Sequence, residues 1–74
     1  MGEPFLCVVI PAFNEEKLIG DAIAQVSAHL STKSYSWEII VADDGSSDRT
    51  AEIVVDAAEG GTRVQLVQIP HRGK

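Results

Sequence analysis

The sequence has few of the features that stabilise very small proteins. Its single cysteine, Cys7, excludes an internal disulfide, and its two histidines belong to no zinc-type cluster of Cys and His. Six basic residues against eleven acidic ones give a net charge of −5 over 74 residues. This acidic balance argues against a nucleic-acid-binding domain, which would present a basic patch. We therefore expect no zinc site and no nucleic-acid partner.

Long hydrophobic runs and targeting signals are also lacking. The apolar stretch at residues 5–12 is far shorter than the roughly 18 residues of a membrane span, and residues 1–4 lack the basic start of a signal peptide. We therefore expect a protein that is cytoplasmic or faces the cytoplasm from a membrane. The glycine-rich motifs of dinucleotide sites and P-loops are absent too, which argues against both of those nucleotide sites.

Three short apolar runs are present, at residues 5–10, 37–42 and 64–69. Continuous runs of this length, bounded by turn residues, are typical of strands buried on both faces of a parallel sheet. The first run is followed by Pro11, whose fixed φ and missing N–H predict the end of that strand.

Two helices are expected between these strands. Asn14 is a favourable N-cap for the first, whose apolar residues recur at helical spacing to about residue 30. Ser47 or Asp48 can cap the second, and Gly60–Gly61 can end it, because glycine tolerates the left-handed conformation. The predicted inner faces include Leu18, Val55 and Ala58. The resulting β-α-β-α-β order is an α/β fold, half of a doubly wound parallel sheet, whose strand-to-helix turns lie at the ligand-binding carboxyl edge.

The turn after the second strand carries two adjacent carboxylates, Asp43 and Asp44, followed by Gly45. Neighbouring carboxylates repel each other unless N–H groups, a cation or a base compensates. One interpretation is that a carboxylate here accepts a hydrogen bond from a nucleobase. The alternative is that one of the two acids forms an Asx turn with Gly45 and the next helix.

The turn after the first strand also offers groups for a ligand. Phe13 could lie against a flat base, and Glu15 could accept a hydrogen bond from a ligand donor. The alternative makes Asn14 a cap, Glu15 a partner of the helix dipole and Phe13 a core residue.

Residues 71–74 read His-Arg-Gly-Lys, so three side chains that can carry positive charge follow the third strand in an otherwise acidic chain. They could contact phosphates at the same edge of the sheet. The alternative is a solvated tail, since chain ends are often poorly ordered.

Taken together, these segments resemble the amino-terminal part of family 2 glycosyltransferases. The resemblance rests on residues 8–16, residues 38–50 and residues 72–74, and it covers residues 5–74. Family members are inverting, nucleotide-sugar-dependent enzymes of the GT-A fold, and the most similar branch is that of the dolichyl- or polyprenyl-phosphate glucosyl- and mannosyltransferases. Two motifs in order, about 30 residues apart and each following a buried strand, carry the resemblance.

The resemblance implies a role for each residue of a nucleotide pocket. The first turn would line the pocket for the base and ribose, and the end of the second strand would contact the base. The basic segment at residues 72–74 would match the start of an R/N-x-G-K-G sequence of the family. The implied nucleotide-binding residues are Pro11, Phe13, Glu15, Ala42, Asp43, Asp44, Gly45, Arg72 and Lys74.

The resemblance also implies what residues 1–74 lack. They would form the amino-terminal nucleotide-binding portion of a GT-A domain that is truncated at Lys74. The metal-binding D-x-D motif for Mg²⁺ or Mn²⁺, the catalytic base and the acceptor site would lie further along the chain. We therefore expect no catalytic residue and no metal ligand in this chain, which alone would be inactive.

The partners implied for the parent protein are a UDP- or GDP-sugar and an acceptor such as a polyprenyl phosphate. An exposed sheet edge also predicts self-association. A different hypothesis is a non-enzymatic α/β module that binds nucleotides weakly at most. Receiver domains and sugar nucleotidyltransferases fit less well, because receivers place their paired acids after the first strand and nucleotidyltransferases place a glycine-rich loop there.

Overall fold

The computed structural model describes residues 5–70 of the chain. The elements follow one another as β1 (Phe5–Ala12), α1 (Ile19–Leu30), β2 (Ser36–Asp43), α2 (Thr50–Glu59) and β3 (Val64–Gln68). This β-α-β-α-β order confirms the predicted fold class.

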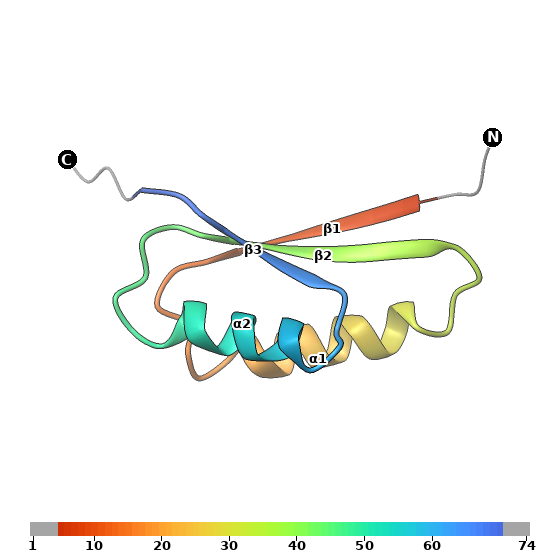
Figure 1. Cartoon of the computed structure of the whole chain (residues 1–74), viewed down its shortest axis with the longest axis horizontal. Coiled ribbons are helices and arrows are strands. Elements are labelled where there is room, and N and C mark those ends of the chain that lie inside the picture. Colours follow the sequence, from red (N-terminus) through yellow and green to blue (C-terminus); the bar gives the residue numbers. More distant parts are fainter. Residues whose placement is uncertain (1–4, 71–74) are drawn as a thin grey trace.

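The strands form one parallel sheet in the order β1-β2-β3, with β2 in the centre. The register places Val8 of β1 opposite Ile39, and Ile39 opposite Val64 of β3. Both helices lie against the same face of this sheet (Figure 1). The first and last described strands are therefore the two edges of the sheet.

The hydrophobic core lies between this face and the helices. Along β2 the side chains alternate, and those of Ile39 and Val41 are completely buried. From α1, Ile19 and Ile23 pack into the same cluster, as does Val54 from α2. Trp37 lies in the core near the start of β2. The guanidinium of Arg63 lies over its ring in a cation–π contact, 5.1 Å from the ring centroid.

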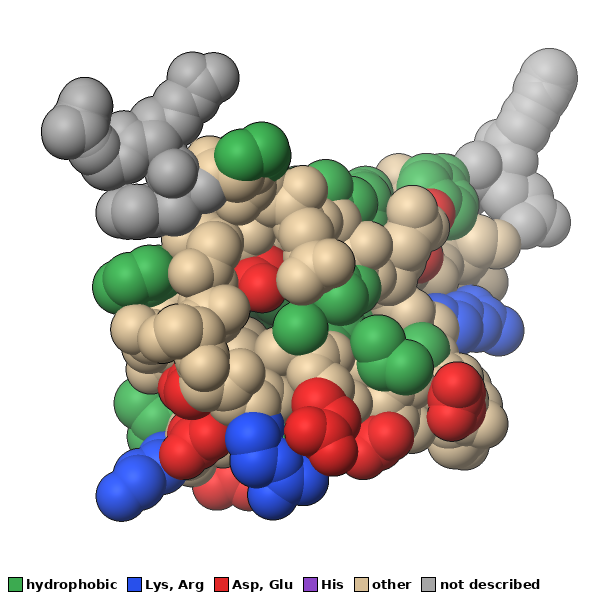
Figure 2. Space-filling model, turned by 60° about the vertical axis from the view of Figure 1, so that its left-hand side comes forward, with side chains coloured by type: hydrophobic (Ala, Val, Ile, Leu, Met, Phe, Trp, Pro, Cys, Tyr) green, Lys and Arg blue, Asp and Glu red, His purple; other side chains and the backbone are tan. Residues whose placement is uncertain are grey.

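The other face of the sheet is open, which corrects the prediction of strands buried on both faces. Phe5 and Val9 of β1 are 60% and 58% exposed, because their side chains alternate with those that face the core. Figure 2 shows hydrophobic side chains at the surface of the upper, sheet side, whereas most charged side chains gather over the helices below. Two crossovers on one side of a three-stranded sheet leave its other side without a helical layer.

Pro11 does not end the first strand as predicted. β1 continues through Pro11, which pairs with Ala42, to Ala12. A proline has no N–H to donate to a neighbour, but an edge strand needs donors on one side only. The position of β1 at the sheet edge therefore allows the strand to pass through this residue.

Both helices begin later than the sequence pattern predicts. α1 starts at Ile19, and Asn14 does not cap it but has φ of 52° in the loop before it. Leu18, at the helix start, is 64% exposed. α2 starts at Thr50, whose N–H donates to Asp48 Oδ1, so Asp48 does assist the helix start.

The end of α2 and part of its inner face can also be compared with prediction. Gly61 has φ of 103°, which confirms a glycine-dependent stop after this helix. Val55 is 41% exposed and Ala58 is exposed, so the predicted inner face was wrong at both positions. Instead Ile53 and Ala57, which lie one turn apart, pack against the core cluster that contains Val54. Within residues 5–70, neither helix has the length and hydrophobicity to cross a bilayer.

Candidate functional site

Two loops follow the carboxyl ends of the neighbouring strands β1 and β2, as the sequence predicted. The first loop covers residues 13–18 and the second loop covers residues 44–49. They start side by side, because the N–H of Asp44 donates to the carbonyl oxygen of Ala12 at 2.9 Å. Phe13 and Asp44 thus leave the sheet from adjacent positions.

The first loop donates three successive backbone N–H groups to side chains that follow β2. The pairs are Asn14 to Ser46 Oγ at 2.8 Å, Glu15 to Thr50 Oγ1 at 2.8 Å, and Glu16 to Asp48 Oδ2 at 3.1 Å. Three polar side chains at every second position therefore accept from three consecutive amides. The segments that they join are 32 to 35 residues apart in sequence.

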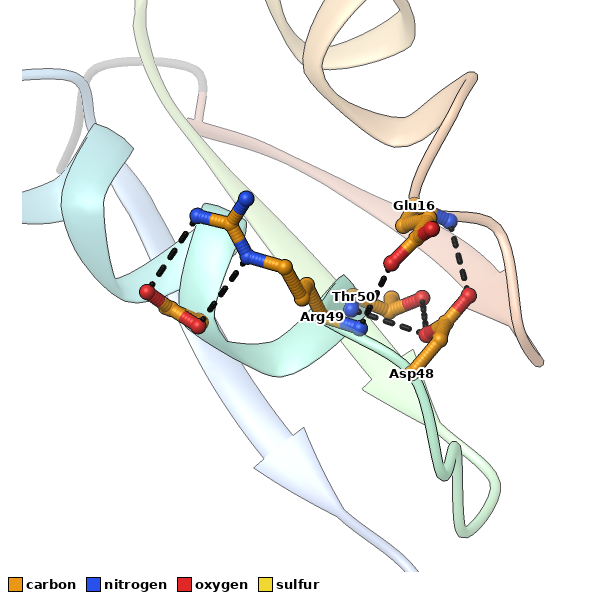
Figure 3. A network of polar contacts seen from close by, with 5 residues as sticks. Glu16, Asp48, Arg49 and Thr50 are labelled. Carbon is orange, nitrogen blue, oxygen red and sulfur yellow. Dashed lines mark hydrogen bonds and ion pairs between the residues drawn. The ribbon is translucent and has the colours of Figure 1, made fainter.

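The second loop donates in return to side chains of the first. The N–H of Ser47 donates to Asn14 Oδ1 at 2.8 Å, and that of Arg49 donates to Glu16 Oε1 at 3.0 Å. Figure 3 shows the part of this arrangement around Glu16, Asp48 and Thr50. We call these five hydrogen bonds between residues 14–16 and residues 46–50 the loop brace.

Two hydroxyl groups of the brace act as relays. Ser46 Oγ accepts from the first loop and donates to Asp43 Oδ1, which also accepts the N–H of Ser46 at 3.2 Å. Thr50 Oγ1 accepts in the same way and donates to Asp48 Oδ1. Asp43 and Thr50 are completely buried, so each relay includes one inner side chain.

The hydrogen bonds around Asp48 set its charge. Burial acts to raise the pKa of this carboxyl, but the hydrogen bonds from the Thr50 side chain, the Thr50 backbone and the Glu16 backbone together outweigh it. The pKa of Asp48 therefore lies below its ordinary value. At neutral pH the brace contains a carboxylate at this position.

The predicted site residues fall into two groups. In the first, Pro11 and Ala42 pair across β1 and β2, and their side chains lie on the open face of the sheet. Phe13 is 46% exposed at the start of the first loop, and Glu15 is half-buried. These groups, with the exposed Asp44, lie around the point where the two strands end.

The remaining predicted residues have other surroundings. Asp43 is turned into the protein, where Ser46 binds one of its oxygens and Oδ2 has no partner among the described residues. Gly45 has φ of 75°, a left-handed conformation that glycine adopts without strain. Arg72 and Lys74 lie outside the described residues.

Two hollows in the surface differ in their relation to these residues. A hollow of about 220 Å³ opens beside Pro11 and Glu15 and is bounded by Leu18. A larger one of about 590 Å³ lies at the opposite end of the sheet, beside Lys33 and Arg63. Only the smaller hollow belongs to the carboxyl edge, where the predicted site lies.

The described residues do not form a metal centre. Among residues 5–70, no group of three or more His, Cys, Asp or Glu side chains is placed to hold an ion. Asp43 and Asp44 are adjacent in sequence, but the first is buried and the second exposed.

The sequence analysis missed four side chains of the loop brace. Asn14 was interpreted as a helix cap, and Glu16, Ser46 and Thr50 were assigned no role in the site. A local signal was present in the alternation of small polar residues at positions 46, 48 and 50. Its partner segment, however, cannot be identified from that alternation alone.

Comparison with known proteins places these observations in a wider context. The model of glycosyl transferase family 2 matches residues 7–74. A dolichyl-phosphate beta-glucosyltransferase of Trichomonas vaginalis is 35% identical over 72 residues, which cover 90% of this chain and 22% of that protein. An undecaprenyl-phosphate 4-deoxy-4-formamido-L-arabinose transferase of Edwardsiella ictaluri is 41% identical over 64 residues, or 85% of this chain and 20% of that protein.

A solved structure has the same arrangement of elements. It is a mannosyltransferase from Pyrobaculum calidifontis in complex with GDP-Man and Mn²⁺, with a TM-score of 0.72 and 28% sequence identity. The similarity covers 93% of this chain and 21% of the mannosyltransferase. The chain thus spans about a fifth of the length of the proteins that it matches.

Proposed function

Because the chain belongs to glycosyl transferase family 2, we propose that residues 1–74 form the amino-terminal nucleotide-binding portion of a GT-A glycosyltransferase domain. The complete protein would transfer a sugar from a UDP- or GDP-sugar to a polyprenyl phosphate. The observation that carries the proposal is the joint position of Phe13 and Asp44 at the carboxyl ends of adjacent strands. In open α/β sheets, ligands bind at this edge.

The base-binding part of the proposed site uses Asp44 and Phe13. Asp44 supplies a carboxylate that accepts from a base N–H, and Phe13 offers a half-exposed ring on which a base can stack. Pro11 and Ala42 form an apolar wall on the adjacent strands. Glu15, beside the small hollow, accepts from the ribose hydroxyls.

The rest of the predicted set supports the pocket or extends it. Asp43 holds the second turn from inside the protein, and Gly45 lets the backbone turn next to the ligand. Arg72 and Lys74 are proposed to contact the phosphates of the donor, because basic side chains form charge-assisted hydrogen bonds with phosphate oxygens.

The proposed reaction is a single inverting displacement. An acceptor oxygen attacks the anomeric carbon while the bond to the nucleoside diphosphate breaks. A polyprenyl phosphate is already ionised near neutral pH, so it needs little help from a general base. The relatives are named for dolichyl- and undecaprenyl-phosphate transfer, which supports a lipid-phosphate acceptor. The proposed location of the complete protein is the cytoplasmic face of a membrane.

A divalent metal and the catalytic groups are assigned to the part of the protein that follows residue 74. The structural neighbour contains Mn²⁺ together with GDP-Man, which supports a Mg²⁺ or Mn²⁺ requirement. The described residues do not fit a metal site, so no step of the reaction is attributed to them.

The experiment uses the complete protein that carries this chain. It is titrated with UDP and GDP by calorimetry, and then assayed for transfer from UDP-glucose and GDP-mannose to dolichyl phosphate with Mg²⁺ or Mn²⁺. We expect binding of one nucleotide and transfer of a sugar with inverted anomeric configuration. Absence of both nucleotide binding and transfer would refute the proposal and favour a non-enzymatic α/β module.

A further inference from the structure

Asn14 contacts two consecutive residues of the second loop. Its N–H donates to Ser46 Oγ and its Oδ1 accepts the N–H of Ser47, both at 2.8 Å. A donor and an acceptor on the same residue fix the direction of the neighbouring loop as well as its distance. The left-handed φ of 52° is part of this arrangement, and asparagine adopts it more readily than most residues.

This contact is connected to the central strand. Ser46, which accepts from Asn14, donates its own hydroxyl to Asp43 Oδ1 at the end of β2. Asp43 is completely buried, so the connection ends on a side chain held by the core. The first loop is therefore anchored to the end of β2, which Asp44 directly follows.

The second loop needs such support because it contains Gly45. With φ of 75° and no side chain, this residue restricts the loop less than any other residue would. Phe13 directly precedes Asn14, and Asp44 precedes Gly45, so the proposed base-binding groups lie next to the braced residues. A pocket that is already ordered loses less conformational freedom when its ligand binds.

We infer that Asn14 is a positioning residue that orders the base-binding pocket without touching the nucleotide. The inference rests on the proposed function, since it concerns the affinity of the same site. The side-chain oxygen of Asn14 fixes the second loop, and through it the spacing between Phe13 and Asp44.

The experiment compares two replacements of Asn14 in the complete protein. Asn14→Gly keeps the positive φ without strain but removes the side-chain acceptor. Asn14→Asp keeps an oxygen acceptor and also tolerates this conformation. The probes are uridine and guanosine, whose lack of charge prevents the added aspartate from repelling a phosphate, and UDP and GDP serve as reference ligands.

Asn14→Gly is expected to bind the preferred nucleoside about tenfold more weakly, the equivalent of about 1.4 kcal/mol. Asn14→Asp is expected to stay within about threefold of the unmodified protein. A matched control is Ser47→Ala, which keeps the backbone N–H that Asn14 accepts. A second control is Ile39→Val, which lowers stability from the core without changing the loops.

Hydrogen exchange provides a second measurement, because the Ser47 amide should exchange about tenfold faster in Asn14→Gly and at the normal rate in Asn14→Asp. If the unmodified protein binds the nucleotide and Asn14→Gly binds it with equal affinity, the inference is overturned and the proposed function stays intact. An equal loss in Ile39→Val, or no rescue by Asn14→Asp, would also overturn it. Failure of the unmodified protein to bind UDP or GDP would overturn the proposed function and, with it, the inference.

Discussion

The backbone N–H of Glu15 donates to the hydroxyl oxygen of Thr50, 35 residues later in the sequence, at 2.8 Å. Thr50 is completely buried at the start of α2, and its hydroxyl also donates to Asp48. One hydroxyl group thus joins the segment after β1 to the helix after β2. This relationship makes Thr50 a structural residue, because its hydroxyl forms hydrogen bonds within the protein.

Replacement of Thr50 by valine should destabilise the protein. The two side chains have similar shapes, so the change removes the hydroxyl and leaves the N–H of Glu15 without its acceptor. An unsatisfied buried group costs about 1–3 kcal/mol of unfolding free energy. Thr50→Ser, which keeps the hydroxyl, is the matched control. Urea unfolding of the variants would measure the difference, and equal stability of Thr50→Val and the unmodified protein would contradict the role of this bond.

Acid should weaken the loop brace through Asp48. Its pKa is depressed in the folded protein, so its contribution to stability is present above the ordinary aspartate pKa and is lost as pH falls through the lower folded value. The loss is expected below about pH 4. An NMR titration of the Asp48 carboxyl carbon, together with exchange protection of the Glu16 amide, would measure both effects.

Thr50→Val provides the control for this titration, because it removes the side-chain hydrogen bond that lowers the pKa of Asp48. In that variant the pKa should move upward. A pKa of Asp48 above its ordinary value in the unmodified protein would show that burial outweighs the hydrogen bonds.

Replacement of Asp44 by alanine should weaken nucleotide binding by the complete protein. A hydrogen bond to a charged acceptor contributes about 1.5–3 kcal/mol, which corresponds to roughly a 10- to 150-fold loss of affinity. Glu52→Ala is the control, because Glu52 forms an exposed ion pair with Arg49 at 3.3 Å and such pairs contribute little. Calorimetric titration with UDP and GDP distinguishes the two, and undiminished affinity in Asp44→Ala would make the second turn purely structural.

The 74-residue chain by itself should be weakly stable and should self-associate. Its open sheet face carries exposed apolar side chains, including Val9 at 58% and Val67 at 40% exposure. Both edge strands of the described sheet also offer backbone groups to another chain. Sedimentation analysis should show oligomers that become fewer in Val9→Lys. A monomer that unfolds cooperatively above about 60 °C would contradict this expectation.

The same chain should also transfer no sugar. Among the described residues no group of three or more His, Cys, Asp or Glu side chains could hold a metal ion, and the proposed catalytic base is assigned to a later segment. Incubation with UDP- or GDP-sugars, dolichyl phosphate and Mg²⁺ or Mn²⁺ should release nucleoside diphosphate at the background rate only. Release above that rate by the purified chain would require a catalytic group within residues 1–74.

The order of elements, and the position of the two polar turns at one edge of the sheet, could be predicted from the sequence alone. Apolar runs at residues 5–10, 37–42 and 64–69, separated by helical periodicity, are local patterns that specify strands and helices. The parallel order then brings the polar turns to one edge of the sheet. Gly61 ends α2 for a reason that is equally local, since its φ of 103° favours glycine.

Other features depended on contacts between distant segments. Whether β1 could continue through Pro11 was decided by its position at the sheet edge, and the exposure of Val9 was decided by the placement of both helices on one face. Asn14 has the residue type of a helix cap, but its partners Ser46 and Ser47 lie 32 and 33 residues away. A local pattern shows that a side chain can form a hydrogen bond, whereas only the packing of the chain determines which group it reaches.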